Sequence, residues 1–398
     1  MDFILFLLKE EIDKIHPFPE NPYNLQGMIY LDYSANAPVR PEVLETLVQT
    51  ESRFPGNVIS LHPAGEASRK EYERLNQKAL QLFGVEPEEY EIVYTSSASE
   101  SNNLAIKGVY ESYKGFGRHI LASGFEHSSV NAALGYLKES GAEVEIVDTN
   151  EKGEIDFSDL HSKLRKDTIL LCLNLLESET GTLQPHREIE ALLKAYPNCH
   201  FLLDATQAIG KIRLDLRGIE LLSCAPHKFG GIAGTAFLLK KKTTVLTPLI
   251  HGGVSVSPYR SGTAPLGLIA SSVKALELAQ KELDEHYRTV SKLHALLVDR
   301  LRSIHGVLFN SPTDFPYILN ISLSSKKASA TVKALADKGI CVSQKSACSI
   351  PNTPSKAIMA IYHDKNRALS SFRISLSYQT TKGEIEELAN AIKEIAHE

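Results

Sequence analysis

The sequence predicts an α/β fold, with a large domain built on a mainly parallel, mixed sheet between helices and a smaller α+β domain at the C-terminus. Three observations support this prediction. The 398 residues exceed one ordinary domain. From Met28 onward, apolar segments typical of strands alternate with amphipathic helical ones. Around 261–265 this pattern gives way to a long, polar-rich helical stretch, so we expect an appendage at 1–27, a large domain at 28–265 and a small domain at 266–398.

In the large domain, short apolar runs bounded by turn residues predict strands, and apolar residues at helical spacing predict helices. Strands are expected at 29–31, 91–94, 119–122, 143–147, 168–173, 200–203, 221–224 and 235–239. Helices are expected at 41–50, 67–83, 102–113, 128–139 and 186–195. Strands that alternate with helices favour a doubly wound sheet.

The small domain begins with a predicted helix at 267–304, which connects the two domains and has no internal Pro or Gly after its start. A strand (317–323), a helix (328–338), an irregular loop around Cys348, a strand (372–377) and a helix from Lys382 follow. In the appendage, Ile4, Leu8 and Ile12 recur at helical spacing before a proline-rich break. We expect this helix to pack on the small domain, and a membrane-surface or partner-binding helix is the alternative.

Composition excludes several classes of function. The 43 Lys and Arg residues against 48 Asp and Glu residues give a net charge of −5 without a basic block, which argues against a nucleic-acid partner. The longest apolar run near the start, 3–8, is too short to cross a membrane, and Asp2 argues against a signal peptide. We therefore expect a cytoplasmic protein without a membrane partner.

The five cysteines show neither CxxC spacing nor a cluster with His, so the sequence predicts no disulfide framework and no metal site. Most of these thiols are expected to be buried and inert. Cys348 differs because its segment, KSACSIPNTP (345–354), is polar and turn-prone, which predicts an exposed thiol.

Four predicted strand ends carry polar groups that should converge, because ligands bind beyond the carboxyl ends of strands in such sheets. The turn around Ser99 could bind an anion or simply cap a helix. Asp204 could face a cationic ring nitrogen or cap the next helix. Lys228 could form a Schiff base or be a solvated loop lysine. His127 could stack on a cofactor or be a helix cap.

Taken together, an anion turn, a buried Asp and a Lys are what a protein must supply to pyridoxal 5′-phosphate (PLP). The chain resembles the class V aminotransferase family, and within it the cysteine desulfurases, from about residue 29 to the C-terminal helix. The segments that carry the resemblance are YLDYSANAPV (30–39), GN…SLHPAG (56–65), TSSASESNNLAIKG (95–108), EH (126–127), DATQA (204–208), HK (227–228), RSGT (260–263), SAC (346–348) and FRISL (372–376).

The resemblance implies a fold type I PLP enzyme. It implies that Lys228 holds the cofactor as a Schiff base, with Asp204 at the pyridine nitrogen and His127 stacked on the ring, where it would also relay protons. The other implied cofactor contacts are Gln207 and Ser178 at the ring oxygen, and Ala98, Ser99, His227 and, from the second subunit of a homodimer, Thr263 at the phosphate.

For the substrate, L-cysteine, the resemblance implies contacts from Asn36, Ser178 and Arg373, the last as a bidentate clamp on the carboxylate. Cys348 matches the cysteine that desulfurases carry in a mobile loop, whose thiolate takes the sulfur as a persulfide and passes it to an acceptor protein. The implied reaction releases L-alanine. Two alternatives stay open: another class V enzyme, such as a selenocysteine lyase, transaminase or C–S lyase, and a non-catalytic paralogue.

Several positions depart from the desulfurase pattern. Ser178 stands where desulfurases usually have Asn, and Ala225 stands where they have a phosphate-binding Ser. Ser97 and Ser99 replace Gly and Thr in the phosphate turn. One lost charge-assisted hydrogen bond would cost ~1.5–3 kcal/mol of cofactor affinity. These changes bear on efficiency and substrate preference more than on cofactor binding.

Overall fold

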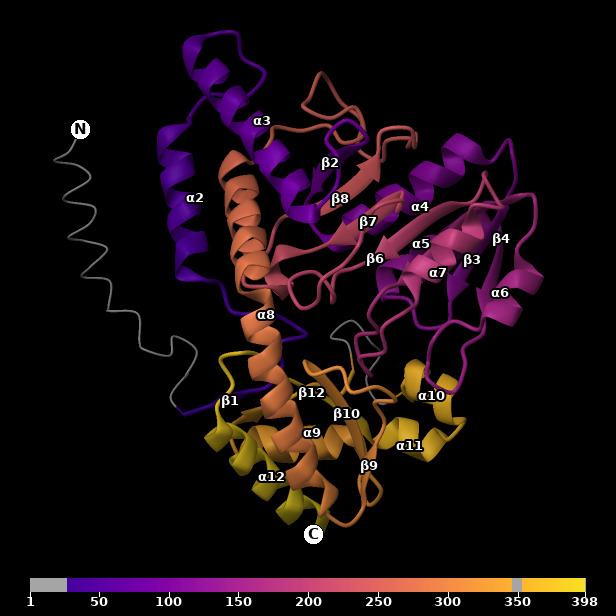
Figure 1. The fold of residues 1–398 in the computed structure, drawn as a ribbon, viewed down its shortest axis with the longest axis vertical. Helices are drawn as coiled ribbons and strands as arrows, with labels where there is room; N and C mark the ends of the chain where they lie inside the picture. Colours follow the sequence, from indigo (N-terminus) through magenta and orange to yellow (C-terminus); the bar gives the residue numbers. More distant parts are fainter. Residues whose placement is uncertain (1–26, 346–352, 398) are drawn as a thin grey trace, which may run out of the picture.

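The computed structural model describes residues 27–345 and 353–397, and a seven-stranded sheet forms its centre (Figure 1). The strand order is β2 (Tyr90–Thr95), β8 (Ala236–Lys241), β7 (Leu221–Cys224), β6 (His200–Asp204), β5 (Thr168–Asn174), β3 (His119–Ser123) and β4 (Glu143–Val147). Strands β7, β6, β5, β3 and β4 are parallel, whereas β8 is antiparallel to both of its neighbours. Consequently β2 points the same way as the parallel strands, and their carboxyl ends share one edge.

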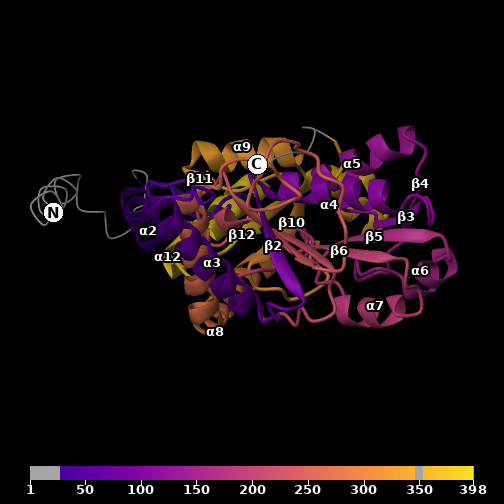
Figure 2. The same cartoon turned by 90° about the horizontal axis from the view of Figure 1, so that it is seen from above.

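The interior strands are apolar because helices cover both faces of the sheet. Every residue of β5 and β6 is buried. Helices α4 (Ala98–Tyr113) and α5 (Ser128–Glu139) cover one face, and α3 (Pro63–Phe83), α6 (Phe157–Lys163), α7 (His186–Leu193) and the first half of α8 cover the other (Figure 2). Helix α2 (Pro41–Arg53) packs against α8.

Helices α3 and α4 begin one turn earlier than the periodicity of apolar residues predicts, because capping groups precede that periodicity. The Ser97 hydroxyl accepts from the Glu100 amide (3.2 Å), and the Glu100 carboxylate accepts from the Ser96 amide (2.7 Å). This reciprocal arrangement satisfies amides that the first turn of α4 leaves unpaired. In α3 the His62 ring accepts from the Gly65 amide (3.2 Å) and Pro63 occupies the first helical position.

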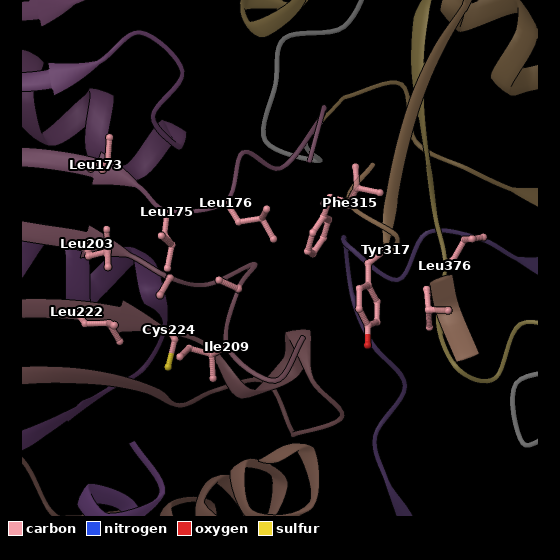
Figure 3. Close-up of a cluster of buried hydrophobic side chains, with 14 of the residues drawn as sticks. Leu173, Leu175, Leu176, Leu203, Ile209, Leu222, Cys224, Phe315, Tyr317 and Leu376 are labelled. Atoms are coloured by element: carbon pink, nitrogen blue, oxygen red, sulfur yellow. The ribbon is translucent and has the colours of Figure 1, made fainter. Parts of the chain in front are cut away.

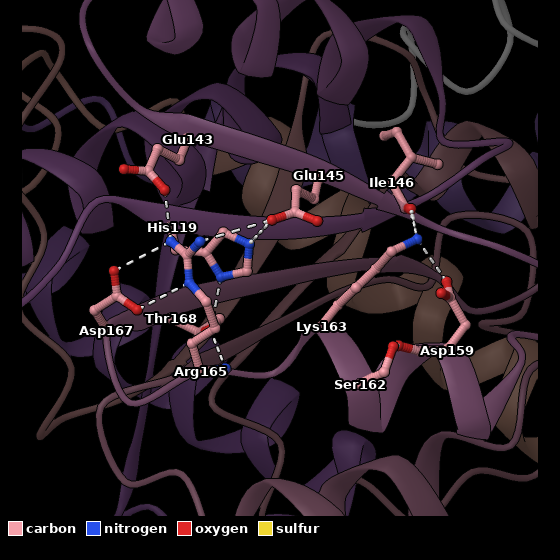
Figure 4. A network of polar contacts seen from close by, with 10 residues as sticks. All are labelled: His119, Glu143, Glu145, Ile146, Asp159, Ser162, Lys163, Arg165, Asp167 and Thr168. Atoms are coloured by element: carbon pink, nitrogen blue, oxygen red, sulfur yellow. Dashed lines mark hydrogen bonds and ion pairs between the residues drawn. The ribbon is translucent and has the colours of Figure 1, made fainter.

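Charged side chains cover the outer edge of the sheet at β4, where backbone groups lack a neighbouring strand (Figure 4). Lys163 of α6 donates to the Ile146 carbonyl (2.8 Å), and Arg165 bonds the Glu143 carboxylate (2.6 Å). Charge on an edge strand discourages pairing with other chains. This network therefore protects the end of the sheet farthest from the antiparallel strand β8.

The second part of the chain follows α8 (Leu266–Arg302), a helix of 37 residues that runs from the large sheet to a smaller one (Figure 1). The smaller sheet is antiparallel, in the order β12 (Ser371–Ser375), β10 (Ile318–Leu323), β9 (Val307–Phe309). Helices α9 (Ala328–Asp337) and α12 (Lys382–His397) were expected, whereas α10 (Lys356–Tyr362) and α11 (Lys365–Ser370) are too short for periodicity to indicate them. Ser355 and Asp364 cap these two short helices.

The strand expected at 29–31 does not join the large sheet. Strand β1 (Ile29–Tyr30) pairs in parallel with β11 (Ile340–Cys341), and Asp32 bridges to Ser375 of β12. A short apolar segment carries no information about which sheet it joins, and the partner here lies more than 300 residues away in the chain. The polar turn that follows β1 is thereby brought between the two sheets.

One continuous apolar core joins the two sheets (Figure 3). It runs from Leu203 and Leu222 of the large sheet through Leu176 to Phe315 and Tyr317 beside the small one.

Gly181, in the turn beyond β5, is needed at this junction. Its φ is +77°, and an added Cβ would lie 3.2 Å from Ile318 and 3.3 Å from Phe315. The turn at 177–181 therefore packs directly on the small sheet. No helix in the described part of the chain is long and apolar enough to cross a membrane.

Two expectations fall outside the described residues: most of the appendage at 1–27, and the loop that carries Cys348. The domain boundary at 265/266 coincides with the start of α8 and stays a prediction.

Candidate active site

A cavity of about 280 Å³ lies at the carboxyl edge of the large sheet, where it faces the small sheet. Nine of the residues singled out in the sequence line it: Ala98, Ser99, His127, Ser178, Asp204, Gln207, His227, Lys228 and Arg373. They come from the carboxyl ends of five strands, β2, β3, β5, β6 and β7, and from β12. The two parts of the chain therefore contribute to one site.

Lys228 lies in the short 3₁₀ turn Pro226–Lys228 that follows β7. Its ammonium donates to the backbone carbonyls of Ser34 (2.9 Å) and Ala35 (2.6 Å), in the turn after β1. Burial, and then the charge of Lys228, lower the pKa of the neighbouring His227 to about 4. His227 is therefore a neutral imidazole at physiological pH, and it can donate a hydrogen bond to an anion without adding a charge.

Asp204 ends β6, is buried, and has both carboxylate oxygens held. Oδ2 accepts from the Asn102 amide group (2.9 Å) and Oδ1 accepts from the Thr206 backbone amide (3.0 Å). The Asn102 amide also donates to the Ser129 hydroxyl (3.1 Å), and its oxygen accepts from Ser223 (2.5 Å). Asp204 thus closes a local turn, as one reading of the sequence suggested, and at the same time presents its carboxylate to the cavity.

His127 also serves in both ways that the sequence allowed. Its Nδ1 accepts from the Ser129 backbone amide (3.2 Å) and so caps α5. The ring itself lines the cavity. Because Nδ1 is used as an acceptor, the neutral ring carries its proton on Nε2.

The N-terminus of α4 forms another wall of the cavity through Ser97, Ala98 and Ser99. Unpaired backbone amides and the helix dipole make this 16-residue helix favourable for a negative charge at its start. Arg260 binds Glu100 at the same end (3.1 Å).

Arg373 of β12 reaches the cavity from the small sheet and is only 1% exposed. One guanidinium nitrogen donates to Asp32 (2.9 Å) and another to the Ser178 carbonyl (2.8 Å). Its Nε has no partner among the described residues. Arg373 therefore connects the turns after β1 and β5.

The turn that carries Ser178 holds two buried carboxyl groups. Glu177 accepts from the backbone amides of Glu179 (2.9 Å) and Thr180 (2.5 Å). Burial, and then the charge of Glu177, raise the pKa of Glu179 to about 7. Glu179 accepts from the Ser355 hydroxyl (2.6 Å), which ties this turn to the start of α10. The turn is thus held rigidly at the cavity.

Two of the expected residues do not line this cavity. Asn36 is exposed, and its backbone carbonyl accepts from the Tyr30 hydroxyl (2.8 Å). Thr263 is also exposed and borders a separate hollow with Val254 and Ile59. Cys348 lies outside the described residues.

Sequence reasoning missed four polar residues at or behind the cavity. Ser34, Asn174 and Thr206 line it, and Asn102 supports Asp204 from behind. Asn174 ends β5 beside Asp204 of β6, so a strand-end position was its only signal.

The cavity fits PLP. Three polar atoms that belong to residues of its lining, the hydroxyls of Ser34 and Thr206 and the Nε of Arg373, are buried without a partner among the described residues. Buried polar groups are rarely left unpaired, so they indicate a polar ligand. A carboxylate, an amine and a helix N-terminus on one cavity match the ring nitrogen, aldehyde and phosphate of PLP.

Comparisons with known proteins agree with this site. The family model described as aminotransferase class-V matches residues 29–388. The chain is 33% identical over 373 residues to a protein named cysteine desulfurase IscS from Dictyoglomus turgidum, covering 92% of this chain and 94% of that one. A cysteine desulfurase IscS from Methanosarcina thermophila is 32% identical, with 94% of each chain covered.

Among solved structures, the NifS-like protein from Rickettsia africae superposes with a TM-score of 0.83 at 27% identity, covering 93% of this chain and 100% of that one. The family model spans both sheets and every cavity residue named above. The chain therefore belongs to the class V aminotransferase family, whose members are PLP-dependent enzymes, and within it to the cysteine desulfurases.

Proposed function

We propose that this protein removes sulfur from L-cysteine, releases L-alanine and carries the sulfur as a persulfide on Cys348 for an acceptor protein. The observation that carries the proposal is the single cavity in which Lys228, Asp204 and the start of α4 meet Arg373 of the small sheet. That arrangement holds PLP on one side and leaves a cationic group for an amino-acid carboxylate on the other.

We assign the residues as follows. Lys228 bonds the cofactor aldehyde and Asp204 keeps the ring nitrogen protonated, with Asn102 and the Thr206 amide holding its carboxylate. Ala98, Ser99 and neutral His227 bind the phosphate, and His127 stacks on the ring. Gln207 and Ser178 face the ring oxygen, and the guanidinium of Arg373 binds the substrate carboxylate.

Bound PLP supplies an electron sink that makes the substrate α-proton acidic. With PLP and substrate in the cavity, the Lys228 amine would be the base that removes this proton. The Cys348 thiolate then attacks the substrate sulfur, so that an S–S bond forms while the C–S bond breaks. The electron pair of the broken bond stays with the substrate carbon, which takes up a proton and leaves as L-alanine. The sum is cysteine plus enzyme thiol going to alanine plus enzyme persulfide.

The experiment that tests this proposal is a comparison of wild type and Cys348→Ser with L-cysteine and a reductant. We expect wild type to release alanine and sulfide in equal amounts and the variant to lose turnover. Mass spectrometry without reductant should find one added sulfur on the peptide bearing Cys348. Equal turnover in both proteins would remove Cys348 from the reaction, and pyruvate or another keto acid as product would indicate a lyase or transaminase.

We further propose that the enzyme is a cytoplasmic homodimer in which Thr263 reaches the phosphate of the neighbouring site. Thr263 is exposed, and around it lie apolar side chains that a single chain leaves in water, among them Val254 (87% exposed) and Ile59 (44% exposed). Leu61, two residues after Ile59 in the chain, is 86% exposed. Large exposed apolar groups of this kind mark interaction surfaces.

Light scattering of the purified protein tests the dimer, with twice the chain mass expected. A sharper test mixes inactive Lys228→Ala chains with Thr263→Val chains of reduced PLP affinity. Mixed dimers contain one site with both Lys228 and the neighbour's Thr263, so PLP binding should recover in that site. A monomer, or no recovery after exchange of subunits, would contradict the proposal.

A further inference from the structure

Lys211 is a buried lysine that has no role in the proposed reaction. It lies in the turn that follows β6, seven residues beyond Asp204, and is 5% exposed. Its ammonium donates to the Gln207 side-chain oxygen (2.7 Å). In the described part of the chain, no carboxylate forms an ion pair with it. A buried cation without a counter-ion is costly, so its retention calls for an explanation.

Lys211 lies close to the proposed PLP-binding lysine. Lys211 and Lys228 both line a small second cavity of about 60 Å³, and Lys228 also lines the candidate PLP cavity. Burial, and then the charges of Lys228 and Arg373, hold the pKa of Lys211 well below its ordinary value. Electrostatic coupling between two groups is mutual, so a proton on Lys211 must weaken proton binding at the nitrogen of Lys228.

The contact with Gln207 also sets the orientation of that amide. The Ser34 carbonyl can only accept, so the Gln207 NH₂ group must face it, and the Gln207 oxygen must face the Lys211 amine, which donates to it. That NH₂ group donates to the Ser34 carbonyl (2.8 Å), which also accepts from Lys228 (2.9 Å). Its second hydrogen remains for the cavity that Gln207 lines.

We propose that Lys211 is a positioning residue of the PLP site, which holds the Gln207 oxygen so that one donor hydrogen of the amide faces the cavity and which, when protonated, places a second positive charge beside Lys228. The inference rests on the proposed role of Lys228. A lysine is activated when another cationic group lies next to it in a buried site. Lys211 acts through Lys228 and Gln207 and does not itself contact substrate.

The test is the pH dependence of the visible absorbance of the bound cofactor, which reports the protonation of its bond to Lys228. Lys211→Met removes the charge and the hydrogen bond, Lys211→Gln removes the charge and keeps a donor, and Lys211→Arg keeps both. We expect the midpoint of the absorbance transition to rise by about one pH unit or more in the Met and Gln variants and to stay near wild type in the Arg variant. If the Lys211→Met variant does not fold, the Lys211→Gln variant provides the same comparison.

Lys240→Met is the matched control, because Lys240 is also fully buried but pairs with Glu91 (2.6 Å) at β2 and β8. It should lower stability and leave the midpoint unchanged. An unchanged midpoint in PLP-loaded Lys211→Met or Lys211→Gln would overturn the inference. A wild type that takes up no PLP would instead overturn the proposed function, so the two failures are distinguishable.

Discussion

Glu126, next to His127, is a buried carboxyl group whose ionisation should make the stability of the protein depend on pH. Its Oε1 accepts from the Ser123 hydroxyl (2.6 Å) and the Asn174 amide (2.7 Å), whereas Oε2 has no partner in the described part of the chain. Burial is the main cause that raises the pKa of Glu126 to about 8, and the charges of Asp204 and Glu177 add to it. The folded protein therefore keeps this group neutral at pH 7.

The sign of the effect follows from comparing the two states. In the unfolded chain a Glu ionises near pH ~4.3, whereas in the folded protein it stays protonated until about pH 8. Between these values the folded state binds more protons, so the free energy of unfolding falls as the pH rises. Each unit of pKa difference corresponds to about 1.4 kcal/mol, which gives a loss of about 3–5 kcal/mol across this range.

Glu126→Gln isolates this contribution, because the amide keeps the shape and the accepting oxygen but cannot ionise. We expect wild type and variant to be similarly stable near pH ~5, and the variant to be more stable by about 3–5 kcal/mol at pH ~8.5. Urea unfolding of the PLP-free protein, followed by circular dichroism because the chain has no Trp, measures the difference.

Glu111→Gln, on the exposed side of α4, is the control and should show no such divergence. A stability difference between wild type and Glu126→Gln that stays constant from acid to alkaline pH would refute the reasoning.

Three further predictions concern single positions. Gly181→Ala should destabilise the protein by about 1–3 kcal/mol in urea unfolding and weaken PLP binding, because φ is +77° and Phe315 and Ile318 leave no room for a Cβ. An unchanged urea midpoint of unfolding would show that the turn can shift. Asp204→Asn should lower kcat by about 100-fold or more while PLP stays bound, since a neutral amide no longer keeps the ring nitrogen protonated; wild-type kcat in the loaded variant would contradict that role. Arg373→Lys should raise KM for L-cysteine by about 10-fold, because a compact ammonium replaces a planar guanidinium that also bonds Asp32 and Ser178. An unchanged KM would show that another group binds the substrate carboxylate.

Much of the large sheet was predictable because its strands are local and apolar. Strands β5 and β6 are buried on both faces, so their sequences are continuous apolar runs that need no knowledge of the partner strand. Lys228, Asp204 and Ser99 were likewise indicated by their places just after such runs, since the carboxyl ends of these strands share an edge.

Other features depend on contacts between distant parts of the chain. β1 was placed in the wrong sheet because its partner, β11, lies over 300 residues away. Asn102 lies in helix α4, whose start was predicted four residues too late, and its contact with Asp204 was not foreseen. Lys211 looks in the sequence like any lysine of a polar turn, and only folding shows that it is buried beside Lys228.

Local periodicity and the residues at strand ends were enough to predict the class of fold and the chemical types of the groups proposed to hold the cofactor. How those groups are oriented and charged depends on the folded chain. Hydrogen-bond partners and burial set the orientation of Gln207, the neutrality of His227 and the support of Asp204, and these depend on segments that meet only when the chain has folded.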